Sequence, residues 1–207
     1  MLEYKRIERK SNTMVKEKVF AKDLDLASKE ELFAKALSYA ALKHQSQKRI
    51  GGTPYIYHPM KVAEIVKDAG YGLEYQIVAI LHDTLEDTDA TEEEILQFGD
   101  DVLEAVILLT RIKGMDENAY VNEILKNKMA AVVKNADKIS NLCDAAYCED
   151  RKWAKRYLGK SKRYYQGKFS KALDYIILAV EDVLEHNVND KTPFPIYWKG
   201  MKLYNEN

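Results

Sequence analysis

Apolar residues recur along most of the chain at spacings of three and four, which is the period of an amphipathic helix. The first such run starts at residue 28 and stops before a Gly-Gly-Thr-Pro stretch at 51–54, which favours a loop. Pro59 then suits the first turn of a second helix. Residues 74–86 are apolar on nearly every side, and this pattern predicts a buried helix.

The second half of the chain continues the helical pattern. Thr91 and Glu94 have the spacing of a capping box, which predicts a short helix up to about Phe98. Further helical runs are expected over residues 101–112, 127–148 and 151–186, the last as one or two helices. Because no strand alternation and no internal repeat occur, we expect an all-α, single-domain helical bundle over residues 28–190.

The two ends of the chain differ from this pattern. Residues 1–27 are charged and weakly patterned, so we expect a peripheral N-terminal arm. Residues 191–207 contain prolines and aromatic residues, which predicts an extended tail that packs its aromatic side chains on the domain. With 207 residues, 46% hydrophobic and 31% charged, the composition is that of a globular protein and excludes wholesale disorder.

Charge and cysteine content limit the classes of function. The chain has 32 Lys and Arg against 33 Asp and Glu, and a net charge of −1 gives no global reason to expect nucleic acid or an acidic membrane as partner. Two cysteines cannot form a disulfide framework, which agrees with a reducing cytosol. Since no apolar signal core or membrane-length apolar run is found, we expect a cytoplasmic protein.

His82 and Asp83 lie inside the apolar run at 74–86, where a buried carboxylate needs a cation or hydrogen-bond donors. Glu86 and Asp87 follow them by four residues and therefore fall on the same side of the expected helix. Three carboxylates and an imidazole would repel one another unless a metal ion or a cationic ligand lies among them. The alternative is a solvated helix end at which Glu86 and Asp87 are simply exposed.

His58 and Asp137 add to this set of polar residues. Taken alone, His58 fits a helix-entry or core histidine, and Asp137 fits a surface residue paired with Lys134. Together with His82 and Asp83 they supply two imidazoles and two carboxylates from three helices. Such a mixed set suits a first-row divalent ion such as Mn²⁺, Fe²⁺ or Zn²⁺.

Four short motifs occur in order: HP at 58–59, LHDTLEDT at 81–88, FG at 98–99 and ADKISNL at 136–142. Their order and spacing resemble those of the HD-domain (p)ppGpp hydrolases, which comprise the hydrolase half of the RelA/SpoT enzymes and the small alarmone hydrolases of the Mesh1 type. The stretch KHQSQKRIGGTPYIYHP at 43–59 is similar to the opening motif of this family. The resemblance covers roughly residues 32–165.

The resemblance implies a metal centre, usually with Mn²⁺, that is held by His58, His82, Asp83 and Asp137. It also implies that Glu86 and Asp87 form the catalytic acidic pair beside a metal-bound water. The implied reaction removes the 3′-pyrophosphate of (p)ppGpp and yields pyrophosphate and GDP or GTP. The ion would lower the pKa of the bound water and neutralise phosphate charge.

The resemblance further implies a nucleotide-binding wall beside the metal. Arg49 matches an arginine that packs against the guanine base, where a planar cation is favourable. Asn141 matches a residue that contacts the sugar, Asp144 is the next polar position, and Tyr157 matches a substrate-contacting tyrosine. One departure is Asn135, which replaces a leucine of the family and is tolerable where it faces outward.

Residues 151–168 contain eight Lys or Arg and no acidic residue. This segment could be a rim that attracts the phosphates of an anionic nucleotide. It could equally be a solvated helix face, or an RNA-binding surface with interleaved tyrosines.

Several functions remain open at this point. The expected one is hydrolysis of (p)ppGpp without synthesis, because the chain is too short for a following synthetase domain. The alternatives are an HD phosphohydrolase that acts on another nucleotide, such as a dNTP, a nucleoside monophosphate or the 2′-phosphate of NADPH, and a non-catalytic nucleotide-binding module. The expected partner is a small-molecule nucleotide, with no membrane and no nucleic acid, and an oligomer is compatible with the pattern.

Overall fold

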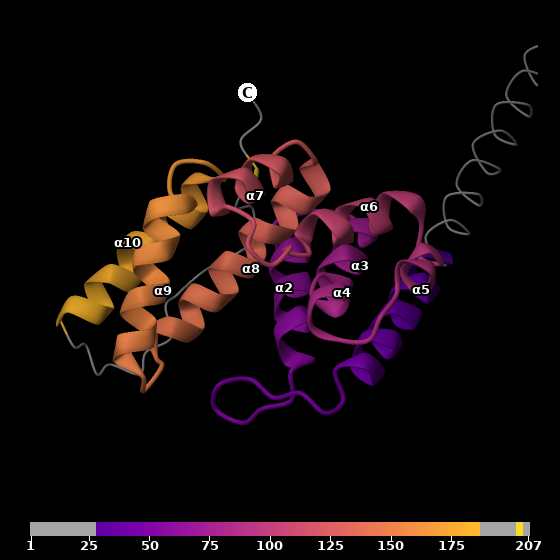
Figure 1. Ribbon diagram of the computed structural model, residues 1–207, viewed down its shortest axis with the longest axis horizontal. Coiled ribbons are helices and arrows are strands. Elements are labelled where there is room, and N and C mark those ends of the chain that lie inside the picture. Colours follow the sequence, from indigo (N-terminus) through magenta and orange to yellow (C-terminus); the bar gives the residue numbers. More distant parts are fainter. Residues whose placement is uncertain (1–27, 187–201, 205–207) are drawn as a thin grey trace, which may run out of the picture.

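A computed structural model describes residues 28–186 and 202–204, and these residues fold as helices joined by short loops (Figure 1). The first described helix covers residues 28–43. It is followed by α2 (Tyr57–Asp68), α3 (Leu73–Leu81), α4 (Thr84–Asp87), α5 (Glu92–Leu96), α6 (Asp100–Leu109), α7 (Glu117–Ile124), α8 (Lys128–Ala146), α9 (Arg151–Tyr164) and α10 (Lys171–His186). Within the described residues no strand forms, and one isolated bridge joins Lys48 to Pro54. The prediction of an all-α fold is confirmed.

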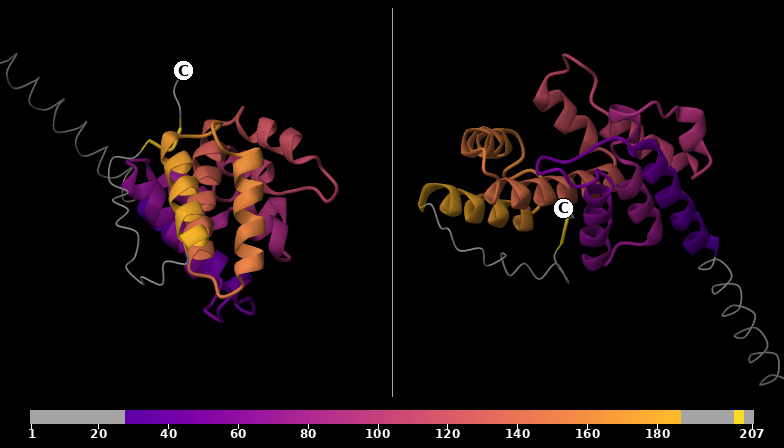
Figure 2. Two further views of the ribbon diagram at one scale, coloured as in Figure 1. Left: turned by 90° about the vertical axis from the view of Figure 1, so that its left-hand side faces the viewer. Right: turned by 90° about the horizontal axis from the view of Figure 1, so that it is seen from below.

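Helix α8 is the centre of the bundle. It contacts α2, α3, α6 and α7 on one side and α9 and α10 on the other (Figures 1 and 2). Its core-facing positions are mostly small or β-branched, and they include Ala130, Ala136 and Val133, all of which are fully buried. Small residues let neighbouring helices approach α8 closely, so segments far apart in sequence meet along its length.

The prediction of one helix over residues 74–86 is wrong. Helix α3 ends at Leu81, a turn follows, and α4 begins at Thr84. The Thr84 hydroxyl donates to the Leu81 carbonyl at 2.6 Å, and His82 Nδ1 bonds the Ala79 carbonyl at 2.8 Å. These side chains satisfy the last carbonyls of α3, which allows the helix to end there. The capping box at Thr91 and Glu94 is present as predicted, whereas α7 was not predicted.

The loop at 44–56 carries Arg49 and turns at two glycines. Gly51 and Gly52 have φ angles of 108° and 88°, which residues with side chains adopt only with strain. The Arg49 N–H donates to the Thr53 carbonyl at 2.9 Å, and the Gly52 N–H donates to the Arg49 carbonyl at 2.9 Å. The Gly-Gly pair therefore closes a tight turn that fixes the position of Arg49.

The predicted arm at 1–27 and most of the predicted tail lie outside the described residues. In the described part of the tail, Leu203 is fully buried and Tyr204 packs partly buried against the core. The condition under which Asn135 was judged tolerable, an outward-facing position, is not met, since Asn135 is 0% exposed. Its Nδ2 donates to Ser170 Oγ at 2.7 Å and to the Leu203 carbonyl at 2.6 Å, so the amide holds Leu203 against α8. No helix in the described ranges has the length and apolar character needed to cross a bilayer.

Candidate metal centre and adjoining pocket

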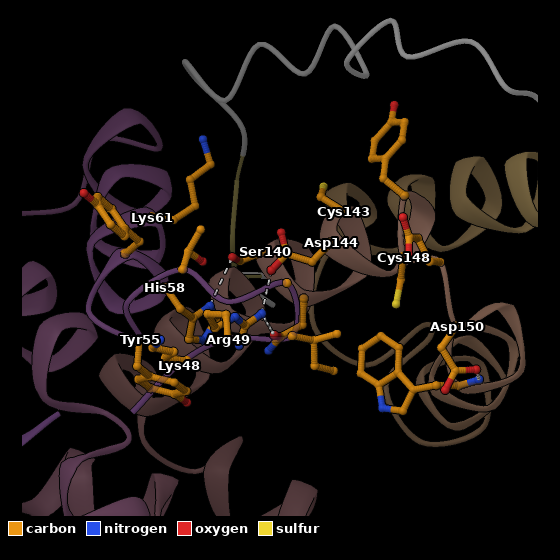
Figure 3. A pocket seen from close by; sticks show the side chains of 18 residues that line it. Lys48, Arg49, Tyr55, His58, Lys61, Ser140, Cys143, Asp144, Cys148 and Asp150 are labelled. Atoms are coloured by element: carbon orange, nitrogen blue, oxygen red, sulfur yellow. Dashed lines mark hydrogen bonds and ion pairs between the residues drawn. The ribbon is translucent and has the colours of Figure 1, made fainter. Parts of the chain in front are cut away.

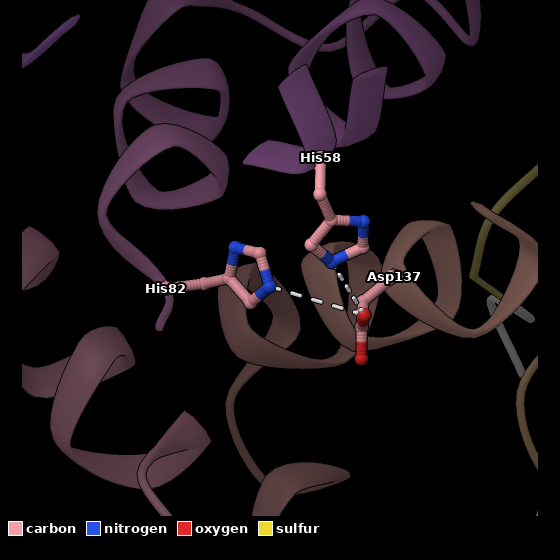
Figure 4. Close-up of side chains that lie close together, drawn as sticks. All are labelled: His58, His82 and Asp137. Atoms are coloured by element: carbon pink, nitrogen blue, oxygen red, sulfur yellow. Dashed lines mark ion pairs between the residues drawn. The ribbon is translucent and has the colours of Figure 1, made fainter. Parts of the chain in front are cut away.

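Three helices bring two histidines and an aspartate together (Figure 4). His58 is the second residue of α2, His82 follows the end of α3, and Asp137 lies in the middle of α8. His58 Nε2 is 3.2 Å from Asp137 Oδ1, and His82 Nε2 is 3.8 Å from the same oxygen. The candidate ligand atoms of all three residues lie within 4.8 Å of one another, and the residues are buried.

Asp83 extends this cluster from the turn between α3 and α4. Its Oδ2 lies 2.9 Å from His82 Nε2 and 3.8 Å from His58 Nε2. The Tyr55 hydroxyl donates to the same carboxylate oxygen at 2.6 Å. The structure thus gathers the four residues that the sequence singled out as a ligand set, which we call the His-Asp cluster: His58, His82, Asp83 and Asp137.

The two imidazoles are oriented as metal-binding histidines are. Because a carbonyl can only accept, His82 must donate from Nδ1 to the Ala79 carbonyl, so in the neutral imidazole the lone pair is on Nε2. That Nε2 atom is buried and makes no aligned hydrogen bond, despite its short distance to Asp83. His58 Nδ1 lies 3.3 Å from Ser140 Oγ, so its Nε2 also faces the cluster. The residues present therefore fit a divalent cation.

The charges of the His-Asp cluster favour a bound cation. Burial would lower the pKa of His82, but the Asp83 and Asp137 carboxylates outweigh it and raise that pKa to about 9. Burial would likewise raise the pKa of Asp137, yet the Lys134 ammonium, 3.0 Å from Oδ2, and the two imidazoles hold it well below its usual range. Without a metal the cluster retains a proton on an imidazole, and a divalent ion would displace that proton.

Glu86 and Asp87 occupy α4, next to the cluster. Both side chains reach solvent, which agrees with the alternative interpretation of an exposed helix end, but both are also in contact with protein groups. Glu86 Oε2 accepts the Arg111 main-chain N–H at 2.9 Å, and Asp87 Oδ2 lies 3.3 Å from the Tyr55 hydroxyl. Partial burial, together with nearby carboxylates, raises the pKa of both groups. They are therefore placed to exchange protons beside the cluster.

A pocket of about 1150 Å³ opens beside His58, and its lining includes Arg49, Tyr55, Asn141, Asp144 and Trp153 (Figure 3). Arg49 Nη2 donates to Asn141 Oδ1 at 2.8 Å and to Asp144 Oδ2 at 2.5 Å. Asn141 Nδ2 in turn donates to Asp137 Oδ1 at 2.5 Å. The predicted nucleotide wall and the His-Asp cluster are thus joined by a continuous chain of hydrogen bonds.

Tyr157 does not line this pocket. It stacks on Trp153 with ring centroids 5.3 Å apart, and its hydroxyl lies 3.3 Å from Lys138 Nζ. The predicted substrate-contacting tyrosine therefore lies beside the pocket residue Trp153, which the sequence did not single out. Tyr55 was also missed, although it stands in the YIYHP motif three residues before His58.

The sequence of this chain is similar to those of several known proteins. Residues 36–153 match the sequence model of the HD domain family. A GTP pyrophosphokinase, rsh, from Brucella suis is 39% identical over 136 residues, which is 59% of this chain and 18% of that protein. Guanosine-3′,5′-bis(diphosphate) 3′-pyrophosphohydrolase MESH1 of Xenopus tropicalis is 34% identical over 151 residues, which is 68% of this chain and 83% of that protein.

A further relative and a solved structure are also similar to this chain. The guanosine-3′,5′-bis(diphosphate) 3′-pyrophosphohydrolase of Aquifex aeolicus is 40% identical over 121 residues, 54% of this chain and 17% of that protein. The chain thus spans less than a fifth of the length of these bacterial relatives. A solved metazoan ortholog of SpoT, which hydrolyses ppGpp, superposes with a TM-score of 0.56 and 25% identity, covering 76% of this chain and 96% of that one.

Proposed function

This chain belongs to the HD domain family, and from that premise we propose that it is a metal-dependent phosphohydrolase that removes the 3′-pyrophosphate of (p)ppGpp. Its products would be pyrophosphate and GDP or GTP. The observation that carries the proposal is the His-Asp cluster, in which four residues from three segments meet beside a pocket large enough for a nucleotide. The substrates named for the MESH1 relative and the metazoan SpoT ortholog support it.

In this proposal His58, His82, Asp83 and Asp137 hold one divalent cation, and Mn²⁺ suits their mixed nitrogen and oxygen atoms. When bound, the cation supplies a water of lowered pKa and neutralises phosphate charge. The largely buried Lys134 side chain holds Oδ2 of Asp137 and leaves Oδ1 turned toward the imidazoles.

Glu86 and Asp87 are the proposed acid–base pair. The reaction breaks the bond between O3′ and phosphorus: water attacks the phosphorus and gives up a proton, while O3′ leaves and gains one. A carboxylate with a raised pKa holds a proton more readily than an ordinary one, which suits a group that must accept the proton of the attacking water.

The pocket residues take the nucleoside. We propose that the Arg49 guanidinium packs against the guanine base and that Asn141 contacts the sugar. Asp144 would hold Arg49 in place, and Tyr157 would act on the substrate only through Trp153. The two proposed groups of residues, for metal and for nucleoside, meet at the hydrogen bond between Asn141 and Asp137.

The domain limits and the location in the cell belong to the same proposal. We propose that the hydrolase unit spans residues 28–190, with 1–27 as a peripheral arm and 191–207 as a tail. A cytoplasmic location is in keeping with the two free cysteines, Cys143 and Cys148.

The proposal is tested by assaying the purified protein with Mn²⁺ against ppGpp, NADPH, nucleoside monophosphates and several dNTPs, with products identified. We expect pyrophosphate and GDP from ppGpp, loss of activity on exhaustive chelation, and recovery with Mn²⁺. Faster turnover of NADPH or a dNTP would favour the alternative HD phosphohydrolase. Binding of nucleotide without any turnover would favour the non-catalytic module, and activity that survives chelation would contradict the metal's role.

A further inference from the structure

Glu117 is a nearly buried carboxylate, 7% exposed, that lies outside the His-Asp cluster and the pocket. The Tyr165 hydroxyl donates to its Oε1 at 2.7 Å. Arg111 Nη2 and Lys160 Nζ lie 3.0 Å and 3.1 Å from its Oε2, as ion pairs rather than as aligned hydrogen bonds. One carboxylate therefore ties α7 to the loop that precedes it and to α9.

Arg111 carries this connection to Glu86. Arg111 lies in the loop between α6 and α7, and its main-chain N–H donates to Glu86 Oε2 at 2.9 Å. The direction of a main-chain N–H depends on the backbone angles of its own loop. The loop is also fixed where it begins, because the Tyr120 hydroxyl donates to the Leu109 carbonyl at 2.5 Å. The Arg111 side chain, held by Glu117, fixes the loop beyond that point.

We propose that Glu117 is a positioning residue for Glu86. By holding the Arg111 guanidinium, it aims the Arg111 N–H at Glu86 Oε2 and leaves Glu86 Oε1 free to face the attacking water. The inference rests on the proposed function for the role of Glu86 in catalysis, but the contact itself does not. Neither Arg111 nor Glu117 belongs to the motifs that suggested the site. The two residues act on Glu86 through the main-chain N–H of Arg111, which a sequence motif does not reveal.

The charged groups around Glu86 make this contact consequential. Asp83 and Asp87 repel a charge on Glu86, and Lys134 attracts it, all from within the site. The Arg111 N–H is the hydrogen-bond donor that stabilises the carboxylate form against partial burial. If the loop moves, Glu86 loses both its orientation and this stabilisation.

The kinetic test compares Glu117→Gln with Glu123→Gln, a change of the same kind on the same helix. Glutamine keeps an acceptor for Tyr165 but loses the charge that holds Arg111. We expect Glu117→Gln to lower kcat by about tenfold with KM within about twofold, because orientation of a proton acceptor acts on the transition state. Among the described residues the Glu123 carboxylate pairs with the neighbouring Lys126 on the surface, so Glu123→Gln should leave kcat unchanged.

A double-mutant cycle separates positioning from general loss of structure. If Glu117 acts through Glu86, adding Glu117→Gln to Glu86→Gln should cause no further loss of kcat. Independent, multiplicative losses would overturn the inference. Should Glu117→Gln fail to fold, Arg111→Ala takes its place, since this partly exposed side chain can be truncated while the main-chain N–H stays; the same pattern is expected of it.

A spectroscopic measurement tests the connection from Glu117 through Arg111 to Glu86 without any turnover. Carbon-13 NMR titration of the Glu86 carboxyl should show its pKa rising in Glu117→Gln and unchanged in Glu123→Gln, because the N–H that favours the charged form is lost. An unchanged Glu86 pKa in Glu117→Gln would overturn the inference even in an active enzyme. A raised Glu86 pKa in Glu117→Gln, in a protein that hydrolyses no nucleotide, would support the positioning of Glu86 by Glu117 while contradicting the proposed function.

Discussion

The His-Asp cluster and the pocket wall share helix α8 but differ in how firmly the protein holds them. Asp137 faces the core, and its side chain is 7% exposed, whereas Asp144, two turns later, is 57% exposed. Every cluster residue has a further protein partner that fixes it, such as Lys134 for Asp137 and the Ala79 carbonyl for His82. Arg49, by contrast, is held through Asn141 and the exposed Asp144.

This difference affects how each region tolerates substitution. The cluster is preorganised by packing of α2, α3 and α8, so a change there disturbs buried charges and the fold together. The wall stands on a surface loop and the exposed end of α8, where a change alters contacts to a ligand at little cost in stability. In the proposed function the cluster would therefore supply the chemistry and the wall the choice of nucleotide.

The largest expected effect is that of Asp137→Ala. The variant loses a proposed ligand and leaves Lys134, whose side chain is 12% exposed, without its carboxylate, which costs roughly 3–5 kcal/mol of folding free energy. We expect loss of bound Mn²⁺ in metal analysis, no measurable hydrolysis, and a lower midpoint in urea. Asp144→Ala, on the same helix, is the control and should keep both metal and fold. An unchanged metal content in Asp137→Ala would remove Asp137 from the ligand set.

Glu86→Gln and Asp87→Asn should separate catalysis from metal binding. We expect each variant to bind Mn²⁺ as the wild type does and to lose about 10²–10⁴-fold in kcat, the usual contribution of a proton-transfer group. Asp89→Asn, in the exposed loop that follows, serves as the matched control. Full hydrolysis by both acidic-site variants would show that neither carboxylate handles the proton.

The raised pKa of Glu86 also has a consequence for stability. A carboxyl whose pKa is higher in the folded state favours folding when protonated, and this contribution is lost as pH rises through that pKa. Glu86→Gln, which mimics the protonated form, should therefore melt at a slightly higher temperature than the wild type at neutral pH. The difference in melting temperature should vanish at pH values below the ordinary carboxyl pKa. A difference that stays the same from neutral pH to that point would show that it does not arise from ionisation of Glu86.

The sequence predicted the cluster better than the wall because the cluster is buried and the wall is exposed. A histidine and an aspartate inside an apolar run, as at 82–83, conflict with burial, and only a compensating site resolves the conflict. The local pattern could not show that the helix breaks after Leu81, because this break depends on the Thr84 hydroxyl and the His82 ring capturing carbonyls. Both residues suit a continuing helix as well as they suit its end.

Contacts that depend on the third dimension were missed or misjudged. Asn135 looked tolerable on an outer face, but its burial depends on Ser170 and Leu203, residues 35 and 68 positions later. The role of Arg111 rests on its main-chain N–H, which every residue but proline possesses. Tyr157 stacks on Trp153 and is not in the pocket lining, a placement that depends on the packing of α9 on α8 and α10.

A smaller effect is expected at the wall. Arg49→Ala should raise KM by about tenfold with little change in kcat, because packing against a base acts equally on ground and transition states. Asp144→Ala should raise KM by no more than about fivefold, the equivalent of an exposed ion pair. Metal content should stay at the wild-type value in both. A pure loss of kcat in Arg49→Ala would count against base packing.

The smallest effect concerns the exposed cations of α9, which lie next to the pocket residue Trp153. Lys152, Lys155 and Arg156 are exposed at helical spacing on this helix, which contains no acidic residue. If they attract an anionic nucleotide, Lys155→Glu/Arg156→Glu should lower kcat/KM by about threefold to tenfold at low salt, and the difference should disappear near 0.5 M salt, where charges are screened within about 4 Å.

The matched control for α9 is Lys35→Glu/Lys67→Glu, which makes the same change in net charge on exposed residues of other helices. An equal loss in both double variants would mean that net charge alone acts, and no loss in either would identify α9 as a solvated face. RNA binding that falls only in the α9 variant would favour the nucleic-acid interpretation. Only a local, salt-sensitive loss of kcat/KM would extend the pocket wall beyond Trp153 and onto the surface of α9.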